Sequence, residues 1–286
     1  MEWTRFPPSR KLNEKSSSLV VRNSYLKMTI LEKITRDKKQ EVVLRKSLIP
    51  TSQLEQTALF GRETTSLAKS LEQGSGIIAE HKRRSPSKSV INNSLSVQDV
   101  AIGYEKAGVS GMSVLTDGKY FGGSLDDLVL ARAASTFPLL RKEFIIDEYQ
   151  ILEAKAYGAD AILLIAACLT QNEIIQFSSM AKSLGLDVLC EAHNEEEVHK
   201  SIHHNIDMIG INNRNLKTFD VSLETSKKLV ELIPDDFVKV SESGISSVEA
   251  IKELKPHGFQ GFLIGENFMK TDNPGKSARE FIEQLK

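Results

Sequence analysis

The sequence predicts an α/β fold, a (β/α)8 TIM barrel with an N-terminal helical extension. Eight short apolar runs recur from residue 76 onward, and helical patterns separate each run from the next. The starts of the runs lie roughly 20 to 35 residues apart, which is the length of one βα unit. The chain length of 286 residues also suits one barrel domain.

Two different segments precede the first apolar run. Residues 1–27 are polar and show no sustained periodicity, so we expect a disordered extension. Residues 28–286 then form the single barrel domain, which includes N-terminal helices within 28–73. In residues 29–49 apolar side chains lie among dense charges, as in an amphipathic helix, and Pro50 predicts where this helix ends.

The eight apolar runs are predicted to be the strands of one parallel sheet. Because the runs are almost continuously apolar, both faces of the sheet should be buried. A doubly wound open sheet is the alternative, but it requires a glycine-rich turn after its first strand, and the segment AEHKRRSPS contains no glycine. The predicted strands lie near 76–80, 111–116, 138–144, 161–166, 187–191, 207–213, 237–243 and 261–266.

Composition excludes several classes of partner. Lys and Arg number 37 against 38 acidic residues, so the charge gives no general attraction to nucleic acid or to a membrane surface. Cys168 and Cys190 lie in apolar runs and are expected to be buried free thiols. With no continuous apolar start and no exposed apolar stripe, we expect a cytoplasmic protein that is a monomer or a weak dimer.

Polar side chains of catalytic type follow six of the predicted strands. The carboxyl ends of barrel strands form the face that carries the active site. Each of these residues alone is more often a solvated rim residue, but their convergence on one face favours a catalytic site. They are Glu80 and Lys82, Lys142, Glu191, Asn212 and Arg214, Glu242 and Ser243, and Glu266.

Two glycines and one charged pair add detail to this face. Gly244 and Gly265 follow the seventh and eighth strands, where barrels often bind phosphate, although each could simply form a tight turn. Lys82 lies two residues after Glu80, so both side chains point to the same side if the extended strand continues. Such a pair could act as an acid and base or as a charge clamp.

Several strings of the sequence resemble those of the indole-3-glycerol phosphate synthase family. They are IIAEHKRRSPSKS, SVLTDGKYFGGS, LLRKEFIIDEYQILEAKAYGADAILLI, GINNRNLKTF and SESGI. The resemblance extends from Met28 to about residue 280. It also implies that the helix from Thr29 packs near the barrel mouth and helps to bind substrate.

The resemblance implies a lyase of tryptophan biosynthesis that uses no cofactor and no metal. Its substrate would be a phosphorylated anthranilate derivative, 1-(2-carboxyphenylamino)-1-deoxyribulose 5-phosphate. Ring closure, decarboxylation and dehydration would convert this compound to indole-3-glycerol phosphate, carbon dioxide and water.

The same resemblance implies roles for individual residues. Lys142 matches the general acid of ring closure and Glu191 the base of dehydration. Lys82 matches a lysine near the substrate carboxylate and phosphate, also with proton-donor roles, and Glu80 matches a carboxylate that orients the lysines. Asn212 and Ser243 complete the implied catalytic set. The other implied contacts are Ser85, Phe144, Leu163, Arg214, Glu242 and Phe121 for the substrate, with Gly244 and Gly265 for the phosphate.

Two alternatives predict other residues. A phosphoribosylanthranilate isomerase would be shorter and would use a cysteine and an aspartate as base and acid, whereas the first strand here carries Glu80 and Lys82. A catalytically silent barrel would lack Lys82, Lys142 or Glu191, and all three are present. Departures from the family pattern are few, and they include Glu143 in place of the usual aspartate and Asn267 in place of a frequent serine.

Overall fold

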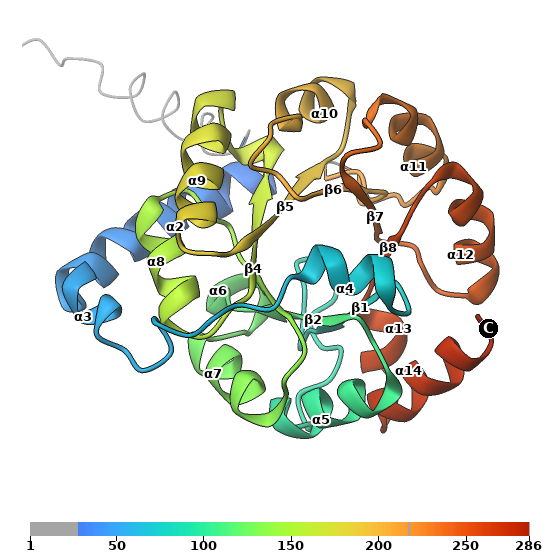
Figure 1. Ribbon diagram of the computed structural model, residues 1–286, viewed down its shortest axis with the longest axis horizontal. Coiled ribbons are helices and arrows are strands. Elements are labelled where there is room, and N and C mark those ends of the chain that lie inside the picture. The colour runs from blue at the N-terminus through green and yellow to red at the C-terminus, as the bar shows by residue number, and fades with distance from the viewer. Residues whose placement is uncertain (1–27, 217, 286) are drawn as a thin grey trace, which may run out of the picture.

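The computed structural model describes residues 28–216 and 218–285, and a closed barrel of parallel strands stands at its centre (Figure 1). Within these described residues eight strands follow one another in chain order, and β1 pairs with β8 to close the barrel. The strands are β1 (Ile77–His81), β2 (Gly111–Leu115), β3 (Leu139–Lys142), β4 (Ala161–Ile165), β5 (Asp187–Ala192), β6 (Met208–Asn212), β7 (Val238–Glu242) and β8 (Gly261–Ile264).

The barrel predicted from the sequence is confirmed, and each of the eight predicted apolar runs overlaps one strand. Successive side chains of a strand point to opposite faces of the sheet. Ile78 and Leu140 accordingly belong to an apolar cluster inside the barrel. Ile77 and Leu139 belong to a second cluster, which packs between the sheet and the helices. The predicted extension, residues 1–27, lies outside the described residues.

A ring of helices surrounds the strands (Figure 1). Polar residues at the ends of the loops start these helices, as Ser96 and Ser124 show when their side chains accept hydrogen bonds from backbone N–H groups of the first turn. The helices after β1 are α5 (Val97–Ala107), α6 (Gly118–Phe121), α7 (Leu125–Ala134), α8 (Glu148–Ala156), α9 (Gln171–Ser183), α10 (Glu195–Ser201), α11 (Glu224–Leu229), α12 (Val248–Leu254), α13 (Glu266–Met269) and α14 (Pro274–Glu283), of which α6 lies at the barrel mouth (Figure 1).

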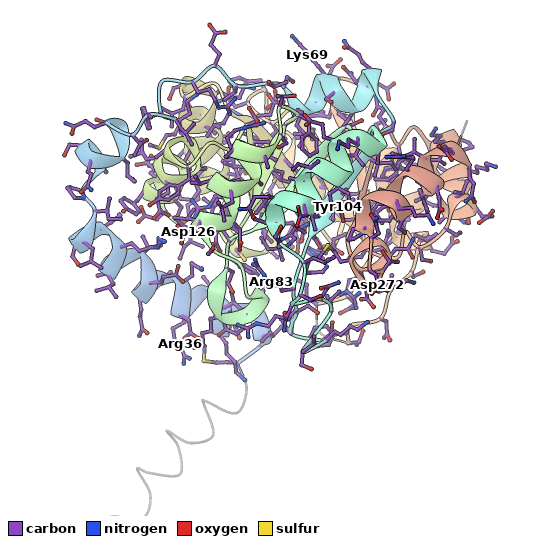
Figure 2. All side chains as sticks on the ribbon, turned by 90° about the horizontal axis from the view of Figure 1, so that it is seen from below. Arg36, Lys69, Arg83, Tyr104, Asp126 and Asp272 are labelled. Carbon is purple, nitrogen blue, oxygen red and sulfur yellow. The ribbon has the colours of Figure 1, made fainter. Side chains whose placement is uncertain are left out.

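The segment before β1 forms three further helices, α2 (Ile30–Leu48), α3 (Thr51–Glu55) and α4 (Leu67–Gln73). A capping box between Thr29 and Glu32 starts α2. Helices α2 and α4 lie at opposite ends of the barrel, as the labelled side chains of Arg36 on α2 and Lys69 on α4 show (Figure 2). Helix α4 leads directly into the start of β1, so it lies at the amino ends of the strands. Helix α2 therefore stands at the carboxyl ends of the strands.

A buried lysine fixes α2 to the barrel. The side chain of Lys38 is only 2% exposed, and its Nζ lies 2.9 Å from Asp117 Oδ2 and 3.1 Å from Glu143 Oε1. Burial lowers the pKa of Lys38, but the carboxylates of Glu143 and Asp117 outweigh this effect and hold the pKa above its usual value. The preceding residue, Asp37, accepts hydrogen bonds of 2.6 Å from Lys119 and Tyr120 of α6. Charge pairing thus attaches α2 to the mouth of the barrel.

We predict that Lys38→Met destabilises the protein by about 3–5 kcal/mol, because it removes the cation that lies between the buried carboxylates of Asp117 and Glu143. Urea unfolding would measure this loss, and amide exchange would show whether α2 opens first. Lys39→Met is the matched control, since Lys39 is exposed on the same helix. Equal unfolding midpoints for the two variants would contradict the anchoring role of Lys38.

Candidate active site

One cavity of about 420 Å³ opens at the carboxyl ends of the strands. Its lining includes Ile30 and Ile34 of α2, so this helix forms part of the cavity, as the family resemblance implies. The structure brings all of the predicted site residues to the lining of this one cavity. They are Glu80, Lys82, Ser85, Phe121, Lys142, Phe144, Leu163, Glu191, Asn212, Arg214, Glu242, Ser243, Gly244 and Gly265.

Four charged side chains at the cavity floor come from the four odd-numbered strands. Glu80, Lys142, Glu191 and Glu242 stand near the ends of β1, β3, β5 and β7. Alternate strands of such a barrel contribute the side chains of one interior layer. Two residues earlier on the same strands, Ile78, Leu140, Leu189 and Val240 belong to the apolar cluster inside the barrel. The charged layer therefore rests directly on an apolar layer that excludes water from below.

The ammonium group of Lys142 lies among the carboxylates of this layer. Its Nζ donates a hydrogen bond to Oε2 of Glu242 and lies 3.5 Å from Oε2 of Glu191. Burial lowers the pKa of Lys142, but the charges of Glu242, Glu191 and Glu80 outweigh burial and raise the pKa above its usual value. Lys142 is therefore a charged hydrogen-bond donor at neutral pH, with 16% of its side chain exposed toward the cavity.

The pKa values of the two carboxyl groups beside Lys142 shift in opposite directions. Burial raises the pKa of Glu242 to about 7, an effect that Lys142 opposes and the neighbouring Glu191 carboxylate reinforces. Burial also raises the pKa of Glu191, but Lys142 and His193 outweigh it and bring the pKa below its usual value. Two carboxyl groups this close cannot both ionise freely. Near neutral pH Glu191 is thus the ionised base, and Glu242 retains a proton for part of the time.

Two glycines make room for these carboxyl groups. A side chain at Gly265 would place its first carbon 2.5 Å from Oε1 of Glu80, and one at Gly210 would lie equally close to Oε1 of Glu242. Either contact is too short for any real side chain. Glu80 also forms an ion pair with Lys82, in which Nζ of Lys82 lies 2.5 Å from Oε1 of Glu80. The sequence could not show that Gly210 makes room for Glu242, because the two residues lie on neighbouring strands.

The rim beyond β6 and β7 is held by amide side chains. Asn212 donates a hydrogen bond of 3.1 Å to Oε1 of Glu191 and accepts one of 3.0 Å from the backbone of Arg214. Ser243 and Gly244 both adopt left-handed backbone conformations, with φ of 65° and 78°. This conformation costs a residue such as serine about 1–2 kcal/mol, and such strain is concentrated at functional sites.

Aromatic and aliphatic side chains also line the cavity. The rings of Phe121 and Phe144 lie 6.0 Å apart, and Leu163 and Phe219 also line the cavity. Sequence reasoning missed Phe219, which has a φ of 63° in the loop after β6. No pattern in the sequence marks a phenylalanine as left-handed, so only the structure could reveal its position.

Residues 28–216 and 218–285 contain no group of three or more His, Cys, Asp or Glu placed to hold a metal ion. In the same part of the chain no helix is both long enough and apolar enough to span a membrane.

Comparison with known proteins decides the family. The family model for indole-3-glycerol phosphate synthase matches residues 31–281. The chain belongs to this family. A synthase of that name from Bacteroides thetaiotaomicron is 48% identical over 257 residues, which cover 90% of this chain and 98% of the relative. Another from Caldanaerobacter subterraneus is 43% identical over 258 residues, which cover 90% and 99%. As a member of the indole-3-glycerol phosphate synthase family, the protein is a lyase of tryptophan biosynthesis.

Solved structures support the fold alone. The 3-hexulose-6-phosphate synthase of Salmonella typhimurium has a TM-score of 0.57 at 11% identity, over 73% of this chain and 98% of that one. A thiamine phosphate pyrophosphorylase from Pyrococcus furiosus has a TM-score of 0.56 at 16% identity, over 77% and 99%. At these identities the shared feature is the barrel.

We predict that Glu242→Gln stabilises the protein more at pH 8 than at pH 5. The pKa of Glu242 is raised to about 7 in the folded state, so its ionisation destabilises the fold progressively as pH rises from the unfolded value through 7. Glutamine resembles the neutral acid and removes this effect, which we expect to be worth roughly 1–3 kcal/mol at pH 8. Urea unfolding at both values of pH would measure the difference, and a pH-independent effect would contradict it.

Proposed function

We propose that this enzyme converts 1-(2-carboxyphenylamino)-1-deoxyribulose 5-phosphate to indole-3-glycerol phosphate, carbon dioxide and water. The observation that carries this proposal is the charged Lys142, which is held between Glu191 and Glu242 at the floor of a cavity with one apolar wall. A cavity of about 420 Å³ lies within the range of small-ligand sites.

Lys142 is the general acid of ring closure in this proposal. When the ring carbon that bears the carboxylate attacks the ketone, the ketone oxygen gains negative charge and then a proton. A charged ammonium can stabilise that oxygen and supply the proton. Carbon dioxide then leaves, and the electron pair of its bond restores the aromatic ring.

Glu191 and Lys82 serve the later steps. Loss of water requires a proton for the departing hydroxyl group and a base for the proton that leaves the carbon skeleton. Glu191 is the base, since it is ionised and Asn212 orients it. Lys82 contacts the substrate carboxylate or phosphate and is oriented by Glu80. These steps are proton transfers, a bond formation and eliminations, so the reaction calls for no cofactor.

The two ends of the substrate occupy different parts of the cavity. We place the phosphate at the loops after β7 and β8, with Gly244, Gly265 and Lys82, and with Ser243 beside them. The aromatic ring lies against Phe144, Leu163 and Phe121. Ser85, Arg214 and Glu242 make the remaining polar contacts.

The cellular setting follows from simpler observations. Both cysteines are free thiols, as expected in a reducing compartment, and we infer a cytoplasmic enzyme. The near-neutral charge gives no reason to propose nucleic acid as a partner. We infer a monomer or a weak dimer.

The proposed reaction is tested by the rise of indole fluorescence after the substrate is added to the purified protein. We predict a rise with the unaltered enzyme and a loss of at least about 10²-fold in rate for Lys142→Ala, the scale of a lost general acid. Lys69→Ala is the control, because Lys69 is exposed on α4 at the opposite end of the barrel (Figure 2).

A flat fluorescence trace from the unaltered enzyme, with substrate binding still measurable by calorimetry, would contradict the proposed reaction. Substantial turnover by a folded Lys142→Ala variant would contradict the role of Lys142 alone. Circular dichroism of each variant establishes that the barrel has formed.

A further inference from the structure

A histidine bridges the carboxylate of Glu191 to a second carboxylate outside the cavity. His193 lies two residues after Glu191, just beyond the end of β5. Its Nε2 lies 3.3 Å from Oε1 of Glu191, and its Nδ1 lies 3.0 Å from Oε2 of Glu197 on α10. The imidazole ring therefore stands between two acidic groups, one in the active site and one in the helix layer.

Glu197 holds this ring in place. Its Oε2 also accepts a hydrogen bond of 2.8 Å from the backbone N–H of His193, and its Oε1 accepts one of 2.7 Å from Nδ2 of Asn194. The orientation of the imidazole is thus fixed from the side of α10. The Nε2 atom is buried and makes no hydrogen bond to a described residue, so its nearest charge is the Glu191 carboxylate.

The imidazole also lines a second recess, between α10 and α11, that is separate from the active-site cavity. This recess leaves the His193 side chain 10% exposed, so a charged ring retains some contact with water. Its other lining residues are Asn194, Glu195, Glu196, Glu224, Thr225, Lys228 and Leu229. Lys228, the cation among them, pairs with Glu195 at 2.8 Å.

We propose that His193 is a positioning residue for the base, an imidazolium that Glu197 fixes in place and that keeps Glu191 ionised and correctly oriented. Because Glu191 acts as a base only in the proposed reaction, this inference rests on the proposed function. The sequence of contacts from Glu197 to His193 to Glu191 resembles a catalytic triad, in which the third group orients the middle one. His193 itself stays outside the substrate cavity, since it is absent from the cavity lining among the described residues.

The surrounding charges favour the imidazolium. Burial lowers the pKa of His193, but Glu197 and Glu191 outweigh burial, with a further contribution from Glu242 of β7, and the pKa lies above its usual value. In return, His193 helps Lys142 to hold the pKa of Glu191 below its usual range. An opposite charge at this distance typically shifts a carboxyl pKa by about one unit or more.

The first test is the dependence of kcat/KM on pH in His193→Gln. Glutamine keeps a donor at the site but carries no charge, so the pKa of Glu191 should rise. We expect the acidic limb of the profile to move about one pH unit upward, with the rate recovering at higher pH. Glu197→Gln should move the limb in the same direction by a smaller amount. His199→Gln, an exposed histidine on α10, is the control and should leave the profile unchanged.

The second test needs no activity and uses the histidine ring resonances in NMR spectra of the whole protein. We expect His193 to titrate above the usual histidine pKa and to lose about one unit in Glu191→Gln. An unchanged His193 pKa in Glu191→Gln would overturn the proposal, as would a uniform fall in the rate of His193→Gln at every pH. If the unaltered enzyme does not convert the substrate, the proposed function fails, and the NMR titration still decides whether His193 and Glu191 are coupled.

Discussion

The balance between one ammonium group and three buried carboxyl groups controls the mouth of this barrel. Lys142 remains charged because Glu242, Glu191 and Glu80 surround it. In return Lys142 offsets the burial of these carboxyl groups, together with Lys82 beside Glu80 and His193 beside Glu191. Removing Lys142 would leave the buried carboxyl groups of Glu191 and Glu242 without the cation that lies beside both. The cluster stands on an apolar layer of the same four strands, so the position of each charge follows from the register of the barrel.

The same kind of interaction attaches the N-terminal helix to the site. Lys38 of α2 is buried against Glu143, which directly follows Lys142 in the sequence. Lys142 and Glu143 both line the cavity, and Glu143 also pairs with Lys38 of α2. The ion pair between Lys38 and Glu143, beside the proposed general acid, thus holds α2 where Ile30 and Ile34 line the cavity.

The sequence could predict what local patterns encode. Apolar periodicity predicted the strands, because a strand buried on both faces needs apolar residues throughout, and Lys142, Glu191 and Glu242 were visible as polar residues at strand ends. The contact between Lys38 and Asp117, the clearance at Gly210 and the bridge through His193 could not be predicted. Each depends on how segments far apart in the chain pack, and no pattern in the sequence singled out His193.

Surrounding carboxyl groups keep Lys142 charged, and NMR titration of its ammonium group would measure this effect. Resonances of isotope-labelled lysine side chains would be followed to high pH, and the Lys142 signal would be assigned by its absence in Lys142→Arg. We expect Lys142 to titrate above the ordinary lysine value of about 10.4. Titration at or below that value would contradict it, because burial would then outweigh the charges of Glu80, Glu191 and Glu242.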